Sequence, residues 1–168
     1  MTNLKITFGD ITKFSGDAIV NAANESLLGG GGVDGAIHRA AGIELLHECS
    51  KLGGCKTGEA KITAAYKLDA KYVIHTVGPV YYEHESSESQ RLLENCYKSS
   101  IKLALENSCK KIAFPLISAG VYGYPKADAL SVAVKTILDF GNSLEVEIIL
   151  FDKEAIEIAK EKFSEYCL

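Results

Sequence analysis

The sequence lacks long apolar runs. Its 168 residues contain no uninterrupted apolar stretch that approaches the length of a bilayer span. The first residues, MTNLKITFGD, also lack the basic segment followed by an apolar one that marks a secretory leader. We therefore expect a cytoplasmic protein, made and kept in the cytosol or a similar compartment, with no membrane partner.

Paired cysteines are missing as well. The five cysteines form an odd set without a CxxC pair, which suits neither a disulfide framework nor a zinc knuckle. His47, Cys49 and Cys55 are close enough in sequence to suggest a metal, but a helix-to-loop segment with incidental thiols explains them better. We expect reduced, mostly buried thiols and no metal site.

An excess of basic residues is also absent, since 18 Lys and Arg stand against 22 Asp and Glu and the net charge is -4. Proteins that grip nucleic-acid backbones usually present clustered Lys and Arg, so duplex DNA or RNA is not expected as the main partner. The chain shows no internal repeat, linker or low-complexity segment. We expect residues 1–168 to form one domain, and nothing in the composition demands a second copy, so a monomer is predicted.

What the sequence does contain is a series of short apolar runs. The first alternates apolar and polar residues, as a strand with one covered face does. Four others are nearly continuous, as in inner strands covered on both faces, and one further run is weaker. Pro115 indicates that its run stops pairing near the end. In chain order the six expected strands are residues 4–8, 17–23, 60–65, 72–77, 111–116 and 147–151.

Helical patterns lie between these runs. Residues 86–107 place apolar side chains on one stripe, with Ser87 and Gln90 at the spacing of a capping box. Further helices are expected over residues 125–141, between a proline and a glycine, and over about 153–166. This alternation predicts an α/β fold, a three-layer α/β/α sandwich around a central mixed, mostly parallel sheet of about six strands.

Two glycine-rich loops follow expected strands. Residues 29–32 are four consecutive glycines, and residues 118–123 read SAGVYG. In open α/β sheets, ligands bind outside the carboxyl ends of strands. Neither 24–37 nor 116–125 contains Lys or Arg, so backbone amides, and the dipole of a helix beginning near Asp34, would hold an anion there. Two such loops suit two linked phosphates, although glycine clusters can also simply form turns.

Two better-known phosphate motifs do not explain the first loop. No Lys-Ser or Lys-Thr pair follows the glycines, which excludes a Walker A loop. Gly30, Gly32 and Gly35 match the GxGxxG spacing, but Gly30 comes seven positions after Ala23. A Rossmann fingerprint turns directly off its strand, so we interpret this match as accidental.

Polar side chains near the first loop are the candidates for chemistry. Asp34 and His38 are four residues apart and share a helix face, and Asn24 can reach the same space. A carboxylate beside a phosphate cradle can orient or deprotonate water. Equally, Asp34 can cap the helix and His38 can be a hydrogen-bonded core histidine. Asp10 poses the same question, since it can cap the following turn or accept from a ligand amino group.

Together these segments resemble the macrodomain family of ADP-ribose-binding modules, and within it the MacroD-type hydrolases. The resemblance covers nearly the whole chain, from Gly9 to Phe151. It rests on motifs that are highly specific as a set, although each alone is weak: GDIT at 9–12, NAAN at 21–24, GGGGVDGAIHRAAG at 29–42, CKTGEAKIT at 55–63, YVIHTVGP at 72–79 and SAGVYGYP at 118–125.

The resemblance implies how ADP-ribose would bind. Asp10 would accept from the adenine amino group, with Ile11 beside it and Phe151 near the adenine ring. Both glycine-rich loops would hold the diphosphate, and the Tyr122 ring would lie near the distal ribose. The residues expected to form these two loops are Gly31, Gly32, Val33, Ser118, Ala119, Gly120, Val121 and Tyr122.

Chemistry at the distal ribose is implied too. Asn24 corresponds to the asparagine that contacts this ribose, and Asp34 to the acidic residue associated with hydrolysis, which many binding-only relatives lack. His38 is expected to support the loop and Asp34 rather than to transfer protons. The insertion and extra metal ligands of zinc-dependent macrodomains are not apparent, and hydrolysis needs no metal or redox cofactor.

The implied function is that of a hydrolase acting on ADP-ribose esters. It would remove mono-ADP-ribose from acidic side chains of proteins and deacetylate O-acetyl-ADP-ribose. The expected partners are therefore ADP-ribose, its ester derivatives and mono-ADP-ribosylated proteins. Three alternatives stay open: a reader that binds ADP-ribose without chemistry, a weak phosphatase acting on ADP-ribose 1''-phosphate, and an NAD-dependent oxidoreductase suggested by the GxGxxG spacing.

Overall fold

A single sheet forms the centre of the protein. The computed structural model describes residues 3–167, and within them the strands are β1 (Asn3–Phe8), β2 (Gly16–Ala23), β3 (Ala60–Ala64), β4 (Ala70–Val77), β5 (Lys111–Phe114) and β6 (Glu145–Leu150). They hydrogen-bond in the order β1-β6-β5-β2-β4-β3. Neighbouring strands are parallel except β3 and β4, which are antiparallel.

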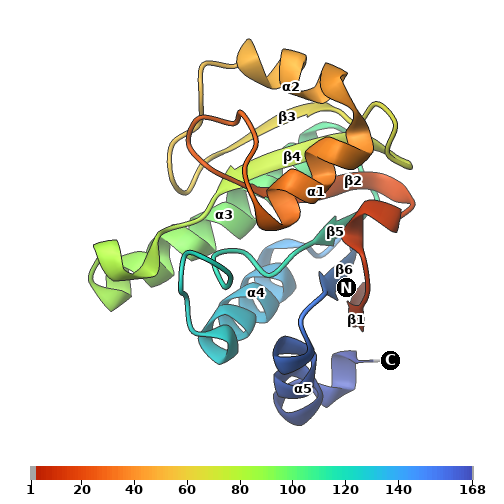
Figure 1. Cartoon of the computed structure of the whole chain (residues 1–168). Helices are drawn as coiled ribbons and strands as arrows, with labels where there is room; N and C mark the ends of the chain where they lie inside the picture. Colours follow the sequence, from red (N-terminus) through yellow and green to blue (C-terminus); the bar gives the residue numbers. More distant parts are fainter. Residues whose placement is uncertain (1–2, 168) are drawn as a thin grey trace.

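Helices cover both faces of this sheet. Over the described residues they are α1 (Gly32–Ala41), α2 (Ile43–Ser50), α3 (Ser86–Glu106), α4 (Lys126–Phe140) and α5 (Lys153–Lys162). α1 and α2 lie on one face, and α3, α4 and α5 on the other (Figure 1). None of the helices in residues 3–167 combines the length and apolar character needed to cross a membrane. The predicted α/β/α sandwich with a mixed, mostly parallel sheet is confirmed.

Alternation along the inner strands divides the core in two. On β4, Ile74 belongs to the cluster beneath α3 and α4, whereas Val73 and Val77 belong to the cluster beneath α1 and α2. Because successive side chains of a strand point to opposite faces, one continuous apolar run serves both clusters. The same alternation places the polar side chains of Asn21 and His75 on the α1 side of the sheet.

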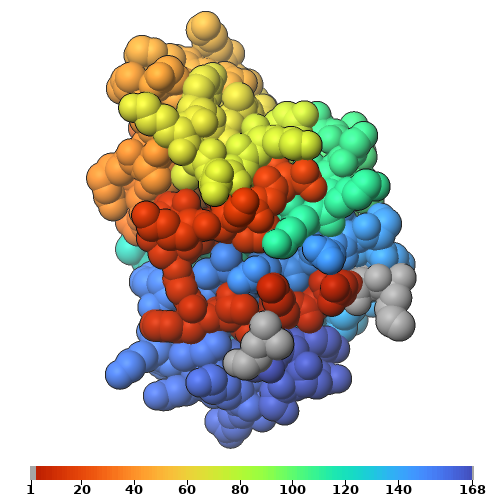
Figure 2. Space-filling view, turned by 90° about the vertical axis from the view of Figure 1, so that its right-hand side faces the viewer, coloured from red at the N-terminus to blue at the C-terminus, as the bar shows by residue number. Residues whose placement is uncertain are grey.

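The parallel strands bring their carboxyl ends to one edge of the sheet. Along that edge run the segments that follow them, residues 9–15, 24–31, 78–85, 115–125 and 151–152. Segments far apart in sequence are thus gathered where ligands of such sheets bind. Figure 2 shows the other side of the molecule, away from these loops, where the N-terminal residues, in red, lie between the orange and yellow part of the chain and the blue C-terminal part.

Two helix ends differ from the sequence prediction. α3 begins one residue before Ser87 without a side-chain cap hydrogen bond, so Ser87 and Gln90 form no capping box. Ser87 already has helical backbone, whereas a capping side chain must stand in the flanking position. α5 ends at Lys162, because Phe163 leaves the helical conformation (φ -134°, ψ 37°) and a short 3-10 turn follows. β5 does end just before Pro115, as predicted.

Candidate active site

A cleft of about 760 Å³ opens at the carboxyl edge of the sheet. Its volume is in the usual range for small-molecule sites. The lining consists of residues 22–24, 30–34, 115–122 and 149–153, together with Gly78, Lys126 and Ala155. Both glycine-rich loops therefore face one cavity. Of the site residues predicted from the sequence, Asp10, Ile11 and His38 are not part of this lining.

The first glycine-rich loop runs into the N-terminus of α1. Gly31 precedes the helix and Gly32 opens it with φ +59°, a conformation that residues with a side chain rarely adopt. A Cβ added at Gly32 would point into open space, whereas one at Gly35 would collide with the Gly30 carbonyl oxygen. The GxGxxG spacing thus reflects close packing of this loop on α1, at the positive end of the helix dipole.

The second loop is closed by its own hydrogen bonds. Ser118 has φ +67°, in the left-handed region, and its hydroxyl donates to the Pro79 carbonyl oxygen at 2.9 Å. The Tyr124 amide in turn donates to the Ser118 carbonyl oxygen at 2.9 Å. Because the Ser118 side chain is buried and engaged by Pro79, this loop offers mainly backbone to a ligand, with the fully exposed Val121 at its tip.

Lys126, at the start of α4, also lines the cleft, although the sequence did not indicate it as a site residue. Its ammonium forms ion pairs with Asp152 and, at 3.0 Å, with Glu154 Oε2. The hydrogen bonds to these two carboxylates raise the pKa of Lys126. Its charge is therefore already paired, which leaves the loop amides as the groups to receive an anion.

Asp34 is the buried carboxylate of the cleft. It is the third residue of α1 and only 5% exposed, so it is not a helix cap. Its Oδ1 accepts from Asn21 Nδ2 at 2.9 Å and lies 3.4 Å from His38 Nε2. A Cβ added at Gly30 would lie 3.2 Å from Asp34 Oδ2 and 3.4 Å from Asn24 Nδ2, so Oδ2 lies next to Gly30 and Asn24, which line the cleft with it. Burial raises the pKa of Asp34.

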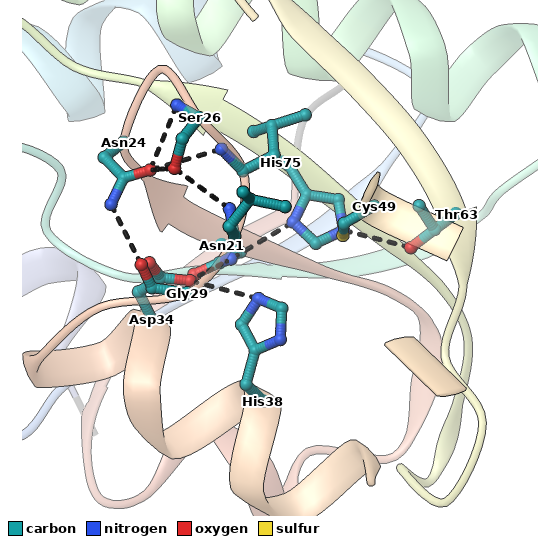
Figure 3. A network of polar contacts seen from close by, with 11 residues as sticks. Asn21, Asn24, Ser26, Gly29, Asp34, His38, Cys49, Thr63 and His75 are labelled. Atoms are coloured by element: carbon teal, nitrogen blue, oxygen red, sulfur yellow. Dashed lines mark hydrogen bonds and ion pairs between the residues drawn. The ribbon is translucent and has the colours of Figure 1, made fainter. Parts of the chain in front are cut away.

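Asn24 shapes the loop that precedes the glycines. Its Nδ2 donates to the Gly29 carbonyl oxygen at 3.0 Å, and its Oδ1 accepts from Ser26 Oγ at 2.6 Å and from the Leu27 amide at 3.2 Å (Figure 3). Next to it, Glu25 Oε2 accepts from the amide and the hydroxyl of Thr57. The Asn24 hydrogen bonds fix its side chain, whose Nδ2 lies next to Gly30, as Asp34 Oδ2 does.

His38 lies behind the loop rather than in the cleft. A Cβ added at Gly29 would lie 3.8 Å from His38 Cδ2, so the imidazole packs under the loop backbone. His38 Nε2 is close enough to Asp34 for an ion-pair contact, but it makes no hydrogen bond of good geometry within residues 3–167. His38 thus lies beside both the loop and Asp34, and its supporting role stays a prediction.

A row of buried polar side chains continues from Asp34 into the sheet. Asn21 Nδ2 lies 3.1 Å from His75 Nδ1, and His75 Nε2 lies 3.0 Å from Thr63 Oγ1. Cys49 Sγ is 3.7 Å from the same Nε2 (Figure 3). The sequence analysis did not single out Asn21 or His75 as site residues. Their only signal was a polar residue inside an otherwise apolar inner strand.

The opposite end of the cleft is more open. Ile149, Leu150 and the 73% exposed Phe151 line it there. Ile11 is buried in the core, and the Gly9 amide donates to the Leu150 carbonyl oxygen, which brings Asp10 to this end. The exposed Asp10 carboxylate accepts from Thr12 Oγ1 at 2.7 Å and from the Thr12 amide at 2.9 Å. These hydrogen bonds lower the pKa of Asp10, which caps the short turn that follows.

The cysteines are free thiols, and all except Cys167 are buried, as predicted. Cys49 packs against His75, and burial raises the pKa of both Cys49 and Cys55. No group of three or more His, Cys, Asp or Glu in the described part of the chain is arranged to hold a metal ion.

Fold and site together define an α/β ligand-binding domain with an amide-lined cradle beside a buried carboxylate. The chain belongs to the Macro domain family, whose model matches residues 20–133. It is 59% identical over 138 residues to the ADP-ribose glycohydrolase MACROD2 of Xenopus laevis, which covers 81% of this chain. The chain spans 33% of the length of that relative.

Shorter relatives match over most of their length. The chain is 57% identical over 143 residues to the O-acetyl-ADP-ribose deacetylase of Escherichia fergusonii, covering 83% of this chain and 80% of the relative. Among solved structures, a mutant macrodomain of Oceanobacillus iheyensis with ADPR superimposes with a TM-score of 0.91 at 42% identity, covering 96% of this chain and 92% of the other. The resemblance to the macrodomain family is thus confirmed.

Proposed function

We propose that this protein is a hydrolase of ADP-ribose esters, which releases mono-ADP-ribose from acidic side chains and deacetylates O-acetyl-ADP-ribose. The observation that carries the proposal is the Asp34 carboxylate, 5% exposed, which lines the cleft with Oδ2 next to Gly30 and Asn24. Support comes from the relatives described as ADP-ribose glycohydrolase and O-acetyl-ADP-ribose deacetylase, and from the related macrodomain with ADPR.

Substrate binding would use the length of the cleft. The adenine would lie at the open end with Asp10, Ile11 and Phe151, and the diphosphate between the two glycine-rich loops. The dipole of α1 and the loop amides favour the phosphate charge at that point. The distal ribose would then lie near Tyr122, beside Asn24 and Asp34, where the ester bond is cleaved.

Cleavage would begin with a water held between the substrate phosphate and the reacting carbon. Asn24 and Asp34 orient this water, and fixing both reactants in one geometry lowers the barrier. Two groups are available to accept its proton, the Asp34 carboxylate and the substrate phosphate. An Asp34→Asn variant separates them, because Asn can orient water but cannot take a proton.

The proposal also covers the oligomeric state, the compartment and the substrates of the protein. We propose that residues 1–168 act as one monomeric domain in the cytoplasm, with mono-ADP-ribosylated proteins as substrates alongside O-acetyl-ADP-ribose. Free thiols at all five cysteines support a reducing compartment. Light scattering of the purified chain tests the monomer, and fractionation of the producing cells tests the compartment.

The direct test is a protein substrate mono-ADP-ribosylated on glutamate. ADP-ribose release is measured for the wild type, for Asp34→Ala and for Asp128→Ala, a matched change in the first turn of α4 away from the cleft. ADP-ribose affinity is measured by calorimetry on the same proteins. We expect release by the wild type and Asp128→Ala only, with binding by all three. Binding without release by the wild type would instead make the protein a reader.

A further inference from the structure

The buried row behind Asp34 is built on the register of the sheet. Asn21 of β2 and His75 of β4 are direct partners in the parallel pairing. Both side chains are fully buried, on the face covered by α1 and α2. Thr63 reaches His75 from the antiparallel edge strand β3 and is 3% exposed. Four polar side chains, ending at Asp34, therefore form one line beneath α1 (Figure 3).

The Ala64 carbonyl, at the end of the row away from Asp34, determines which groups along the row donate and which accept. A backbone carbonyl can only accept, so Thr63 Oγ1 donates its proton to the Ala64 oxygen at 3.0 Å. Thr63 Oγ1 is then left as an acceptor for His75 Nε2–H at 3.0 Å. A neutral imidazole carries one N–H, so His75 Nδ1 presents a lone pair.

That lone pair decides how the Asn21 amide is turned. The group 3.1 Å from His75 Nδ1 must be the NH₂ of Asn21, because its carbonyl would face the lone pair without a proton between them. The second N–H of the same NH₂ points at Asp34 Oδ1, 2.9 Å away. Asn21 Oδ1, in contrast, has no hydrogen-bond partner within residues 3–167. The amide is thus held by its donor side, at the cost of a buried unpaired acceptor.

We propose that His75 is a positioning residue for Asp34, acting through Asn21, with Thr63 and the Ala64 carbonyl fixing its tautomer. The row keeps a donor on Asp34 Oδ1 and so leaves Oδ2 facing the cleft. It holds the carboxylate in one rotamer, which catalysis by an oriented water requires. The role in turnover rests on the hydrolase activity proposed above, whereas the tautomer of His75 is a property of the unliganded protein.

The surroundings keep His75 uncharged across neutral pH. Burial, and then the nearby His38, lower the pKa of His75 to about 3. Cys49, from α2, stays a thiol because burial raises its pKa to about 11. The other titratable groups near this end are Glu48, beside Cys49, and Tyr122, across the cleft from Asp34. A neutral His75 keeps its tautomer over the pH range in which the protein would act.

The tautomer is read directly by NMR. Long-range ¹H–¹⁵N spectra of the ¹⁵N-labelled wild type distinguish protonated Nε2, protonated Nδ1 and imidazolium. The His75 signals are assigned by elimination, with the variants His38→Gln, His47→Gln and His84→Gln. We expect His75 to be neutral and protonated on Nε2 from pH 5 to 8. An Nδ1–H tautomer, or an imidazolium in this range, would overturn the proposal without any variant of the row.

The effect on turnover is measured with two variants. Thr63→Val removes the hydroxyl but keeps the shape of the side chain, and Thr63→Ser keeps the hydroxyl. We expect kcat to fall about tenfold in the valine variant, the size of one buried hydrogen bond, with ADP-ribose affinity unchanged. The hydrogen bond from Asn21 lowers the pKa of Asp34, so weakening it should move the acidic limb of the rate profile to higher pH. The serine variant should behave as the wild type.

The outcomes separate this proposal from the hydrolase itself. A folded valine variant with wild-type kcat and pH profile would overturn the positioning role. Equal loss in the valine and serine variants would overturn it too, because packing and not the hydroxyl would then matter. Absence of turnover in the wild type would refute the hydrolase, and with it a role for His75 in turnover, while the NMR result still reports whether the row exists.

Discussion

Asp34, in the lining of the cleft, and Asp10, beside its open end, are held in opposite ways. Asp10, at the open end, is exposed, and hydrogen bonds from Thr12 lower the pKa of its carboxyl. Asp34, at the other end, is buried, and burial raises its pKa. Asp10 depends on one neighbour two residues away, whereas Asp34 depends on side chains from β2 and α1 and, behind them, from β3 and β4.

This difference indicates two tasks. An exposed carboxylate with a single local partner suffices to recognise an amino group, and its loss costs one contact. A carboxylate that must orient water needs a fixed rotamer, and fixing it takes supporting side chains that never touch the ligand. Changes at the Asp34 end should therefore act on turnover, and changes at the Asp10 end on affinity.

The largest effect is expected from Asp34→Asn. The substitution keeps size and shape but removes the charge and the ability to accept a proton from water. We expect kcat for a glutamate-linked ADP-ribose substrate to fall by about 10²- to 10⁴-fold, the usual contribution of a general base. ADP-ribose affinity by calorimetry should stay within about threefold. A kcat near that of the wild type would assign the proton to the substrate phosphate instead.

A side chain at position 32 should obstruct the middle of the cleft, between the Asp10 and Asp34 ends. Its φ is +59° and an added Cβ would enter open space where the diphosphate is expected. Gly32→Val should weaken ADP-ribose binding by about a hundredfold or more, close to 3 kcal/mol. Gly53→Val is the matched control, because Gly53 has φ +73° and open space as well, but lies in an exposed loop away from the cleft.

Comparison of these two variants separates strain from obstruction. Both place a β-branched residue where the left-handed backbone conformation disfavours it, so both should lower the melting temperature. Only Gly32→Val should lose ADP-ribose. Tight binding by this variant would contradict a diphosphate held between the two loops.

At the open end, Asp10→Ala should weaken ADP-ribose binding by about 1 to 3 kcal/mol, through loss of one hydrogen bond to the adenine. The substitution also removes the cap of the following turn, so part of the loss comes through Thr12. Asp10→Asn keeps an acceptor for both and should bind within a few-fold of the wild type. In saturating substrate, kcat of both variants should match the wild type, and a large fall in kcat would contradict the division between the two ends.

Much of the fold and part of the candidate site could be predicted from the sequence. Continuous apolar runs located the inner strands, and the glycines of residues 29–32 located a loop that lines the cleft, because each pattern has a local physical cause. The support of Asp34 could not be read in this way. Asn21 and His75 are 54 residues apart in sequence, and only the parallel register of β2 with β4 makes them neighbours. Lys126 was missed for a similar reason, since its pairing with Asp152 depends on tertiary structure.

The smallest effect is expected in the pH dependence of folding stability, which compares Asp34 and Asp10 directly. The pKa of Asp34 in the folded protein lies above the ordinary aspartate value of 3.8, so ionising Asp34 opposes folding as the pH rises through that raised pKa. Asp34→Asn should therefore gain stability relative to the wild type as the pH rises from about 3.8 toward neutrality. Asp10 is shifted the other way, so its stabilising effect is present above 3.8 and is lost as the pH falls through its lowered pKa.

Urea unfolding of Asp10→Asn, Asp34→Asn and the wild type between pH 3 and 7 measures these opposite slopes. Relative to the wild type, Asp10→Asn should lose stability with rising pH, over a window below that in which Asp34→Asn gains. Because an exposed carboxylate is screened by water, the Asp10 change should be the smaller of the two. Parallel curves for the two variants would mean that the aspartates are not held differently, and the contrast between the two ends of the cleft would then rest on geometry alone.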